Sequence, residues 1–177
     1  MSCSSVRVAS VVIGALVVAG CGRPSFEYPP PEQRSNTFAL SDLEPPFVEM
    51  SWRNTNEWIV RDISPVREGV RRWAFEHPEL KFILNSTKRQ TLVADVGLPP
   101  DTLAQTGPVT LSFFVNDHPT GALAYETAGD RRFSAPVPAE WLTTAGYTRV
   151  RIEPSRVFVA GDGAKLGFVL YRAGFVE

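Results

Sequence analysis

The chain has 177 residues and carries 18 lysines and arginines against 19 aspartates and glutamates, a net charge of −1. Its basic residues are scattered along the sequence, whereas a nucleic-acid partner requires a clustered basic face. No polybasic run follows the N-terminal segment either, which argues against an anionic lipid surface as a partner of the folded domain.

The first 21 residues have the pattern of an export signal. Arg7 precedes a largely apolar run from Val8 to Val18, in which Ser10 is the one polar residue. This run is far shorter than the roughly 20 residues that a membrane-spanning helix needs. The order Val-Ala-Gly-Cys that ends at Cys21 resembles the lipobox of bacterial lipoproteins. This resemblance implies cleavage before Cys21 and attachment of lipid to its thiol. The alternative is an ordinary signal peptide whose cleavage site falls near a cysteine.

Removal of residues 1–20, which carry one arginine and no acid, leaves 157 residues with 17 basic and 19 acidic side chains. Cys3 lies in the signal and Cys21 would carry lipid, so no thiol remains for a disulfide, a nucleophile, a zinc site or an iron–sulfur cluster. The only histidines, His77 and His118, do not have the spacing of a metal site. We expect no cofactor and no bound metal.

Residues 21–37 are rich in proline, including Pro29–Pro31, and polar between the prolines. Such a stretch favours extended, partly polyproline-like structure. We interpret residues 21–37 as the lipidated N-terminus and a flexible tether, and residues 38–177 as one domain. A domain of this length can bury a substantial core.

From residue 38 onward, short apolar or alternating runs are separated by turn residues, and no amphipathic helical run of 11 or more residues occurs. This pattern predicts an all-β fold, an antiparallel two-sheet β-sandwich of jelly-roll type. The clearest expected strands are 79–84, 91–98, 109–116, 132–137, 148–153 and 165–171. Weaker candidates are 47–52, 57–63, 72–75 and 122–127, and short helical turns are expected at 100–104 and 138–143.

Alternation assigns the two faces of each strand, because successive side chains point to opposite sides. The apolar face is expected to fill the space between the sheets. Its members are Leu80, Phe82, Leu84, Leu92, Ala94, Val96, Leu98, Val109, Leu111, Phe113, Val115, Phe133, Ala135, Val137, Val150, Ile152, Leu166, Phe168 and Leu170.

The opposite, outward positions mix aromatic rings with charges of both signs. Sugars are recognised by such mixtures, since their C–H faces stack on rings while amides, carboxylates and guanidinium groups bind hydroxyls. Trp58 is included among the candidate ligand-binding residues because Asn54, Asn56 and Glu57 surround it in the sequence, although a buried tryptophan is the commoner outcome. The alternative is a solvated sheet surface with cross-strand ion pairs. The candidate ligand-binding residues are Trp58, Phe114, Asn116, Tyr147, Arg149 and Arg151.

Motifs for catalysis are missing from the sequence. It contains no Gly-x-Ser-x-Gly elbow, phosphate loop or dinucleotide fingerprint. Asp117, Asp130 and Asp162 are interpreted as turn acids and not as a calcium loop, whose acids are more densely spaced. His118 is interpreted as an exposed turn residue. We expect no enzyme and no catalytic residues, although two carboxylates brought together by folding would suit glycoside hydrolysis.

Three stretches carry a second resemblance: the strand Gly107–Asn116, the segment Gly129–Val137, and Trp141-Leu142 followed by Tyr147–Ile152. Their order is similar to the jelly-roll domains of the galactose-binding-like and carbohydrate-binding-module class. Asp117 stands where those domains usually have glycine, and Gly146-Tyr147-Thr148 replaces the usual Gly-x-Asn-Thr. The resemblance covers about residues 70–175 and implies a fold, while no ligand-binding residue follows from it.

Together these features predict a lipid-anchored, non-catalytic lipoprotein of the cell membrane or outer membrane, facing the periplasm or the exterior. Its expected partners are the membrane, through Cys21, and an envelope polysaccharide or an envelope protein. The first function is a carbohydrate- or glycan-binding module. The alternatives are a structural or assembly lipoprotein that binds another envelope protein and, more weakly, a glycan hydrolase.

Overall fold

The computed structural model describes residues 46–177. The expected signal peptide, Cys21 and the tether lie outside the described residues. Within residues 46–177, no helix has the length and hydrophobicity required to cross a bilayer. Eleven strands and one short α-helix make up the fold: β1 (Phe47–Glu49), β2 (Ile59–Ile63), β3 (Arg72–Ile83), β4 (Thr91–Leu98), α1 (Pro100–Thr106), β5 (Val109–Val115), β6 (His118–Tyr125), β7 (Gly129–Pro136), β8 (Tyr147–Pro154), β9 (Phe158–Val159), β10 (Lys165–Leu166) and β11 (Phe168–Val176).

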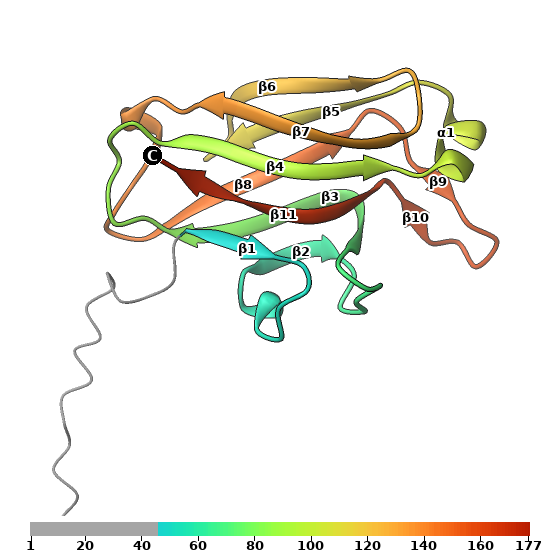
Figure 1. The fold of residues 1–177 in the computed structure, drawn as a ribbon, viewed down its shortest axis with the longest axis horizontal. Coiled ribbons are helices and arrows are strands. Elements are labelled where there is room, and N and C mark those ends of the chain that lie inside the picture. The colour runs from blue at the N-terminus through green and yellow to red at the C-terminus, as the bar shows by residue number, and fades with distance from the viewer. Residues whose placement is uncertain (1–45) are drawn as a thin grey trace, which may run out of the picture. The chain divides into compact units, whose positions relative to one another are not determined.

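The strands pack as an antiparallel β-sandwich, which confirms the predicted fold class. One layer has the order β6-β5-β8-β3, with β2 also paired to β3. The other has the order β11-β4-β7, with β1 also paired to β11. Figure 1 shows β7, β4 and β11 in front of β6, β5 and β8. The chain passes repeatedly between the layers, as it does from β4 to β5 and from β7 to β8, which is the connectivity expected of a jelly roll.

β3 joins the two layers because its two halves pair with different strands. Its first residues, 72–74, pair with β11, whereas residues 79–83 pair with β8. The sequence predicts two separate strands here, at 72–75 and 79–84, and Pro78 lies between them. The structure merges them into one strand. Pro78 lies where the pairing between β2 and β3 passes from Glu79 to Ala74. Its missing N–H therefore removes no hydrogen bond between these strands.

The predicted core is confirmed, except that two of its expected residues are only partly buried. Side chains from both layers fill the interior, and nearly all of the expected residues are buried. Ala135 and Leu166 are only half-buried, because each lies in a strand at the edge of its sheet. A parallel stack of Phe113 and Phe133, with ring centroids 3.7 Å apart, connects the layers through the core.

The expected strand 165–171 is divided at Gly167. A Cβ atom at this position would lie 2.4 Å from the carbonyl oxygen of Phe75, and the Gly167 N–H donates to the Ala74 carbonyl at 2.9 Å. Only glycine permits this close approach of two backbones. β10 therefore pairs with β9 as a separate hairpin before the chain enters β11.

The loop between β5 and β6 is shorter than the sequence suggests. Val115 pairs directly with His118, so the turn consists of Asn116 and Asp117, both with positive φ (45° and 67°). This is the geometry of a two-residue hairpin turn whose twist matches that of the strands. The interpretation of His118 as a turn residue is wrong, since it is the first residue of β6. Asp130 likewise lies in β7, whereas Asp162 is in a turn.

Candidate functional site

The outer face of β8 and its neighbours brings most of the predicted site residues together. β8 pairs with β5 on one side and β3 on the other. Along β8, the buried residues Thr148, Val150 and Ile152 alternate with the outward-facing Tyr147, Arg149, Arg151 and Glu153. We call this surface the β8 face.

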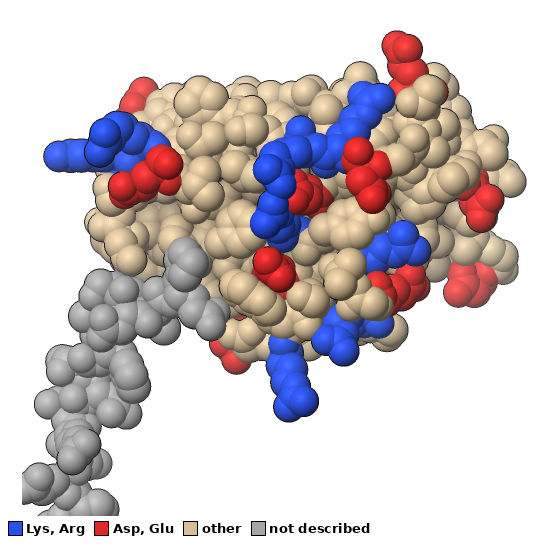
Figure 2. All heavy atoms as spheres, in the orientation of Figure 1, with Lys and Arg blue, Asp and Glu red and all other residues tan. Residues whose placement is uncertain are grey.

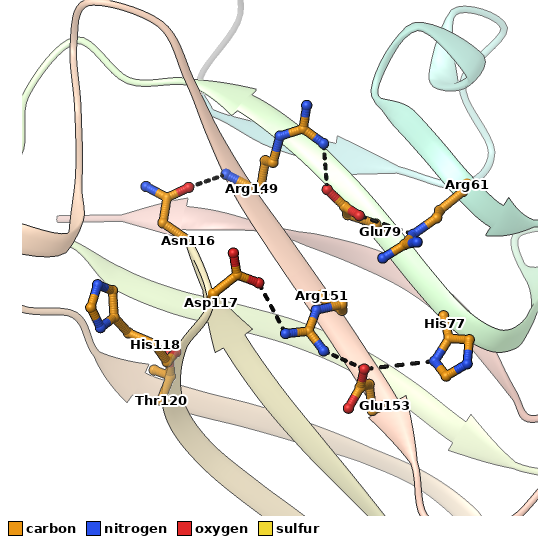
Figure 3. A network of polar contacts seen from close by, with 10 residues as sticks. All are labelled: Arg61, His77, Glu79, Asn116, Asp117, His118, Thr120, Arg149, Arg151 and Glu153. Carbon is orange, nitrogen blue, oxygen red and sulfur yellow. Dashed lines mark hydrogen bonds and ion pairs between the residues drawn. The ribbon is translucent and has the colours of Figure 1, made fainter.

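Glu79 lies at the centre of the first ion cluster on the β8 face. Its carboxylate contacts the Arg149 guanidinium at 2.6 Å and Nε of Arg61 at 3.0 Å (Figure 3). The Glu79 side chain is only 10% exposed, whereas both arginines are more than half exposed. A buried carboxylate needs such partners to compensate its desolvation. Glu79 therefore fixes two guanidinium groups whose remaining N–H donors face outward.

Arg151 lies at the centre of a second cluster beside the first. It forms ion pairs with Asp117 at 3.0 Å and with Glu153, and Glu153 also lies 3.6 Å from Nδ1 of His77 (Figure 3). Burial acts to lower the pKa of Arg151, but the hydrogen bonds to Glu153 and Asp117 outweigh it and raise the pKa above its usual value. The Arg151 guanidinium also stacks over the Phe114 ring at 4.4 Å. The guanidinium of Arg151 therefore already occupies one face of the Phe114 ring.

A depression of about 310 Å³ connects the two clusters. It is lined by Arg61, Glu79, Asp117, Arg149 and Arg151. Guanidinium donors and carboxylate acceptors thus face the same small volume. Such a surface can bind a ligand that both donates and accepts hydrogen bonds, in particular one with several hydroxyl groups.

A smaller cleft of about 140 Å³ lies at the end of β8 where Tyr147 begins the strand. It is lined by Glu57, Trp58, Lys81, Ile83 and Tyr147. The Tyr147 side chain is 53% exposed, and the Lys81 ammonium lies 4.8 Å from the centre of its ring. An accessible ring, an ammonium group and a carboxylate therefore border the same cleft.

Trp58 is partly buried and packs against Phe82, with ring centroids 5.8 Å apart. It contributes to the core and to the wall of the cleft at once. Among the described residues, its indole Nε1 is buried without a hydrogen-bond partner. A buried donor without a partner carries a desolvation cost.

Asn116 has a structural role in the hairpin turn. Its side-chain oxygen accepts a hydrogen bond from the backbone N–H of Arg149 at 2.8 Å, and its amide nitrogen donates to the Trp141 carbonyl at 2.7 Å. Trp141 in turn stacks on His118 at 4.8 Å. The Asn116 amide thus ties the turn to β8 and to the short helical turn Ala139–Trp141.

Sequence reasoning did not identify Glu79, Arg61 or His77 as members of this surface. Glu79 lies on the expected strand 79–84, but its ion-pair partners come from β2 and β8. Arg61 is 18 residues before it in the sequence and Arg149 is 70 residues after it. Alternation shows which face a residue occupies, whereas strand order decides its neighbours. No signal in the sequence gives that order.

Comparisons with known proteins give distant structural similarities and no match in sequence. No family model and no curated protein matches it. Similar solved structures include the CBM36-1 domain of a multidomain xylanase from the hindgut metagenome of Trinervitermes trinervoides, with a TM-score of 0.41 and 9% identity over 74% of this chain and 97% of that one. The CBM51-2 and INT domains of Clostridium perfringens ZmpB give a TM-score of 0.32 and 9% identity over 76% and 29% of the two chains.

A family GH115 4-O-methyl-α-glucuronidase, BtGH115A, gives a TM-score of 0.38 and 16% identity over 60% of this chain and 14% of that one. The match thus spans only a small part of that enzyme's length. Two of these three structures include carbohydrate-binding modules. The similarities are distant, and no ligand or site residue is transferred from them.

Proposed function

We propose that this chain is a lipid-anchored, non-catalytic envelope lipoprotein whose β-sandwich binds glycans through the β8 face. The lipid would be attached to Cys21, and residues 21–37 would hold the domain away from the membrane. The proposal of a location rests on the lipobox-like sequence. The proposal of a ligand rests on the geometry around Tyr147.

The observation that carries the glycan proposal is the cleft beside Tyr147. An aromatic side chain with more than half of its surface exposed offers an apolar platform for the C–H face of a sugar ring. Glu57 and Lys81 border the same cleft and supply an acceptor and a donor for the hydroxyl groups. A site with an apolar platform and a few placed polar groups is the usual form of a small-ligand site.

The ion clusters extend this cleft along β8. Arg149 follows Tyr147 on the same face, and its guanidinium is held by Glu79 on one side only. The hydrogen bond to Glu79 limits the conformations of Arg149 before any ligand arrives. Pre-organised donors lower the entropy cost of binding, which suits a sugar chain lying along the strand.

The alternative of an envelope-protein interface would favour a contiguous exposed apolar patch with a polar rim. In residues 46–177, the exposed large apolar side chains other than Tyr147 are valines on β2, on the loop before β3, on β9 and at the end of β11: Val60, Val66, Val70, Val159 and Val176. Their distribution over separate elements supports the glycan proposal in preference to this alternative.

The test is a glycan array of bacterial envelope and plant polysaccharides, probed with the full-length chain in detergent and followed by calorimetry. We expect Tyr147→Ala to weaken binding at least tenfold, while Tyr147→Phe retains most of it because the ring remains. Val66→Ser, on a loop that does not line the cleft, is the control. If no glycan is bound, or if Tyr147→Ala binds as tightly as the wild type, the proposed site is wrong.

The same protein tests the non-catalytic part of the proposal. Each polysaccharide bound on the array is incubated with the chain, and new reducing ends are measured over time. We expect none to form. Release of reducing ends that disappears in a variant with one acid of the β8 face replaced, Glu153→Gln, would instead support the hydrolase alternative.

A further inference from the structure

We propose that the opposite outer surface, formed by β7, β4 and β11, carries a second saccharide-binding groove that takes a neutral, hydroxyl-rich chain. Figure 2 shows basic and acidic side chains gathered near the centre of this surface. Two depressions of about 550 Å³ and 420 Å³ lie there and share Asp130 and Tyr171. Because they adjoin at this pair, the groove is elongated, as a linear chain requires.

Asp95 arranges the guanidinium groups of the groove. Its carboxylate accepts two hydrogen bonds from Arg132, at 2.6 and 3.0 Å, and one from Nε of Arg172 at 2.5 Å. Arg132 donates through Nε and one terminal nitrogen, whereas Arg172 donates through Nε alone. The terminal nitrogens of Arg172 therefore have no hydrogen-bond partner among the described residues. Both arginines are partly exposed. Asp95 thus holds two sets of N–H donors at the groove surface.

The centre of the groove depends on a glycine. Tyr171 donates a hydrogen bond to Asp130 at 2.9 Å, and the Asp130 side chain lies over Gly97 of β4. A Cβ atom at Gly97 would be 2.3 Å from Asp130 Oδ1 and 3.2 Å from the Tyr171 ring. The pairing of β11 with β4 shifts between Leu170 and Arg172, so Tyr171 lies at a bulge, a feature that redirects side chains.

The balance of charges identifies the class of ligand. Three guanidinium groups and three carboxylates line the larger depression, together with the hydroxyls of Ser51 and Tyr171; the charged residues are Arg131, Arg132, Arg172, Glu49, Asp95 and Asp130. An anionic ligand would meet three carboxylates, and a cationic one would meet three guanidinium groups. A neutral polyol accepts hydrogen bonds from one set and donates them to the other without meeting a like charge, so it is compatible with both.

The rim of the same depression offers an apolar contact. Val70, from the loop before β3, is 63% exposed and lines the groove. A sugar ring has apolar C–H faces beside its hydroxyls, and an exposed valine at the edge of a polar groove suits it. The two outer surfaces of the sandwich would then hold two glycan segments, and two linked segments bind more tightly than one through their raised effective concentration.

The experiment measures the stoichiometry and affinity of saccharide binding by calorimetry with the full-length chain in detergent. The probes are cellohexaose, xylohexaose and chitohexaose as neutral chains, and tri-galacturonate as an acidic one. We expect at least one neutral probe to bind the Tyr147→Ala variant at one site per chain. Adding Arg172→Gln, or separately Tyr171→Phe, should weaken that remaining binding at least tenfold.

The outcomes separate this inference from the proposed function. Binding that survives Tyr147→Ala but is lost with Arg172→Gln supports the groove, even if the β8 face binds nothing. The groove is wrong if no neutral probe binds, if Tyr147→Ala removes all binding, or if tri-galacturonate is the only probe whose binding depends on Arg172. Unfolding in urea establishes that each variant is folded, and Arg172→Lys, which keeps the charge, is the matched control for Arg172→Gln.

Discussion

Asp95 connects three strands through a single carboxylate, because Arg132 comes from β7 and Arg172 from β11. The hydrogen bond from Arg132 is the main cause that lowers the Asp95 pKa, and Arg172 adds to it against the opposing effect of burial. A carboxyl group with a lowered pKa in the folded state stabilises the protein above its unfolded pKa of about 3.9. This stabilisation is lost as the pH falls through the folded value.

We therefore expect Asp95→Asn to lower the free energy of unfolding by about 1 kcal/mol at pH 7. The difference between wild type and variant should shrink as the pH is lowered below about 4. Urea denaturation at a series of pH values measures it. Asp117→Asn is the control, because the Asp117 side chain is 89% exposed and its ion pair should contribute little. A difference that is constant from pH 7 to pH 2 would contradict the account of Asp95.

Asn116 combines an unusual backbone conformation with two side-chain hydrogen bonds. Asn116→Ala removes both bonds and places a Cβ-bearing residue without a polar side chain at a φ of 45°, so we expect a loss of about 2–3 kcal/mol. Asn116→Gly loses the bonds but tolerates the φ angle, and it should be less destabilising by about 1 kcal/mol. Thermal unfolding compares the two. Equal losses would show that the backbone conformation contributes nothing.

At the scale of elements, the core and the strands could be predicted because alternation is a local property. β4 matches the expected strand at both ends, and its buried apolar side chains are the ones that alternation selects. β3 could not be predicted as one strand, because a proline normally interrupts a strand by removing a backbone hydrogen bond. Pro78 is tolerated here because the pairing of β2 with β3 passes from Glu79 to Ala74 without it. The members of the β8 face that were missed depend on strand order, which sequence does not contain.

Neighbouring residues of β5 test this alternation directly. Phe113 is fully buried and stacks on Phe133 of β7, whereas Phe114 faces outward under Arg151. Phe113→Ala should lower the free energy of unfolding by about 3–5 kcal/mol through the cavity it leaves. Phe114→Ala should cost about 1 kcal/mol, as the loss of one partly exposed cation–π contact implies. Urea denaturation measures both, and similar losses in the two variants would contradict the assigned faces.

At the scale of the whole molecule, the two outer surfaces differ in what the sequence reveals of them. The β8 face could be predicted in part, because Tyr147, Arg149 and Arg151 alternate along one strand. The groove on the other surface draws its residues from β1, β4, β7 and β11 and from loops, so no single strand displays it. Both surfaces belong to one sandwich, so a glycan-binding function would engage the domain from two sides.

The proposed lipid anchor at Cys21 is a property of the whole chain that can be tested independently of the folded domain. The sequence has two cysteines, Cys3 and Cys21, and only the second follows the lipobox-like residues. Stable attachment requires acyl chains buried in the bilayer, so we expect Cys21→Ala to shift the protein from the membrane fraction to the soluble fraction or to leave it uncleaved. Cys3→Ser is the matched control and should stay with the membrane. Mass spectrometry of the mature N-terminus should find acyl groups on Cys21, and an unmodified cysteine there, or membrane release by Cys3→Ser, would contradict the proposed anchor.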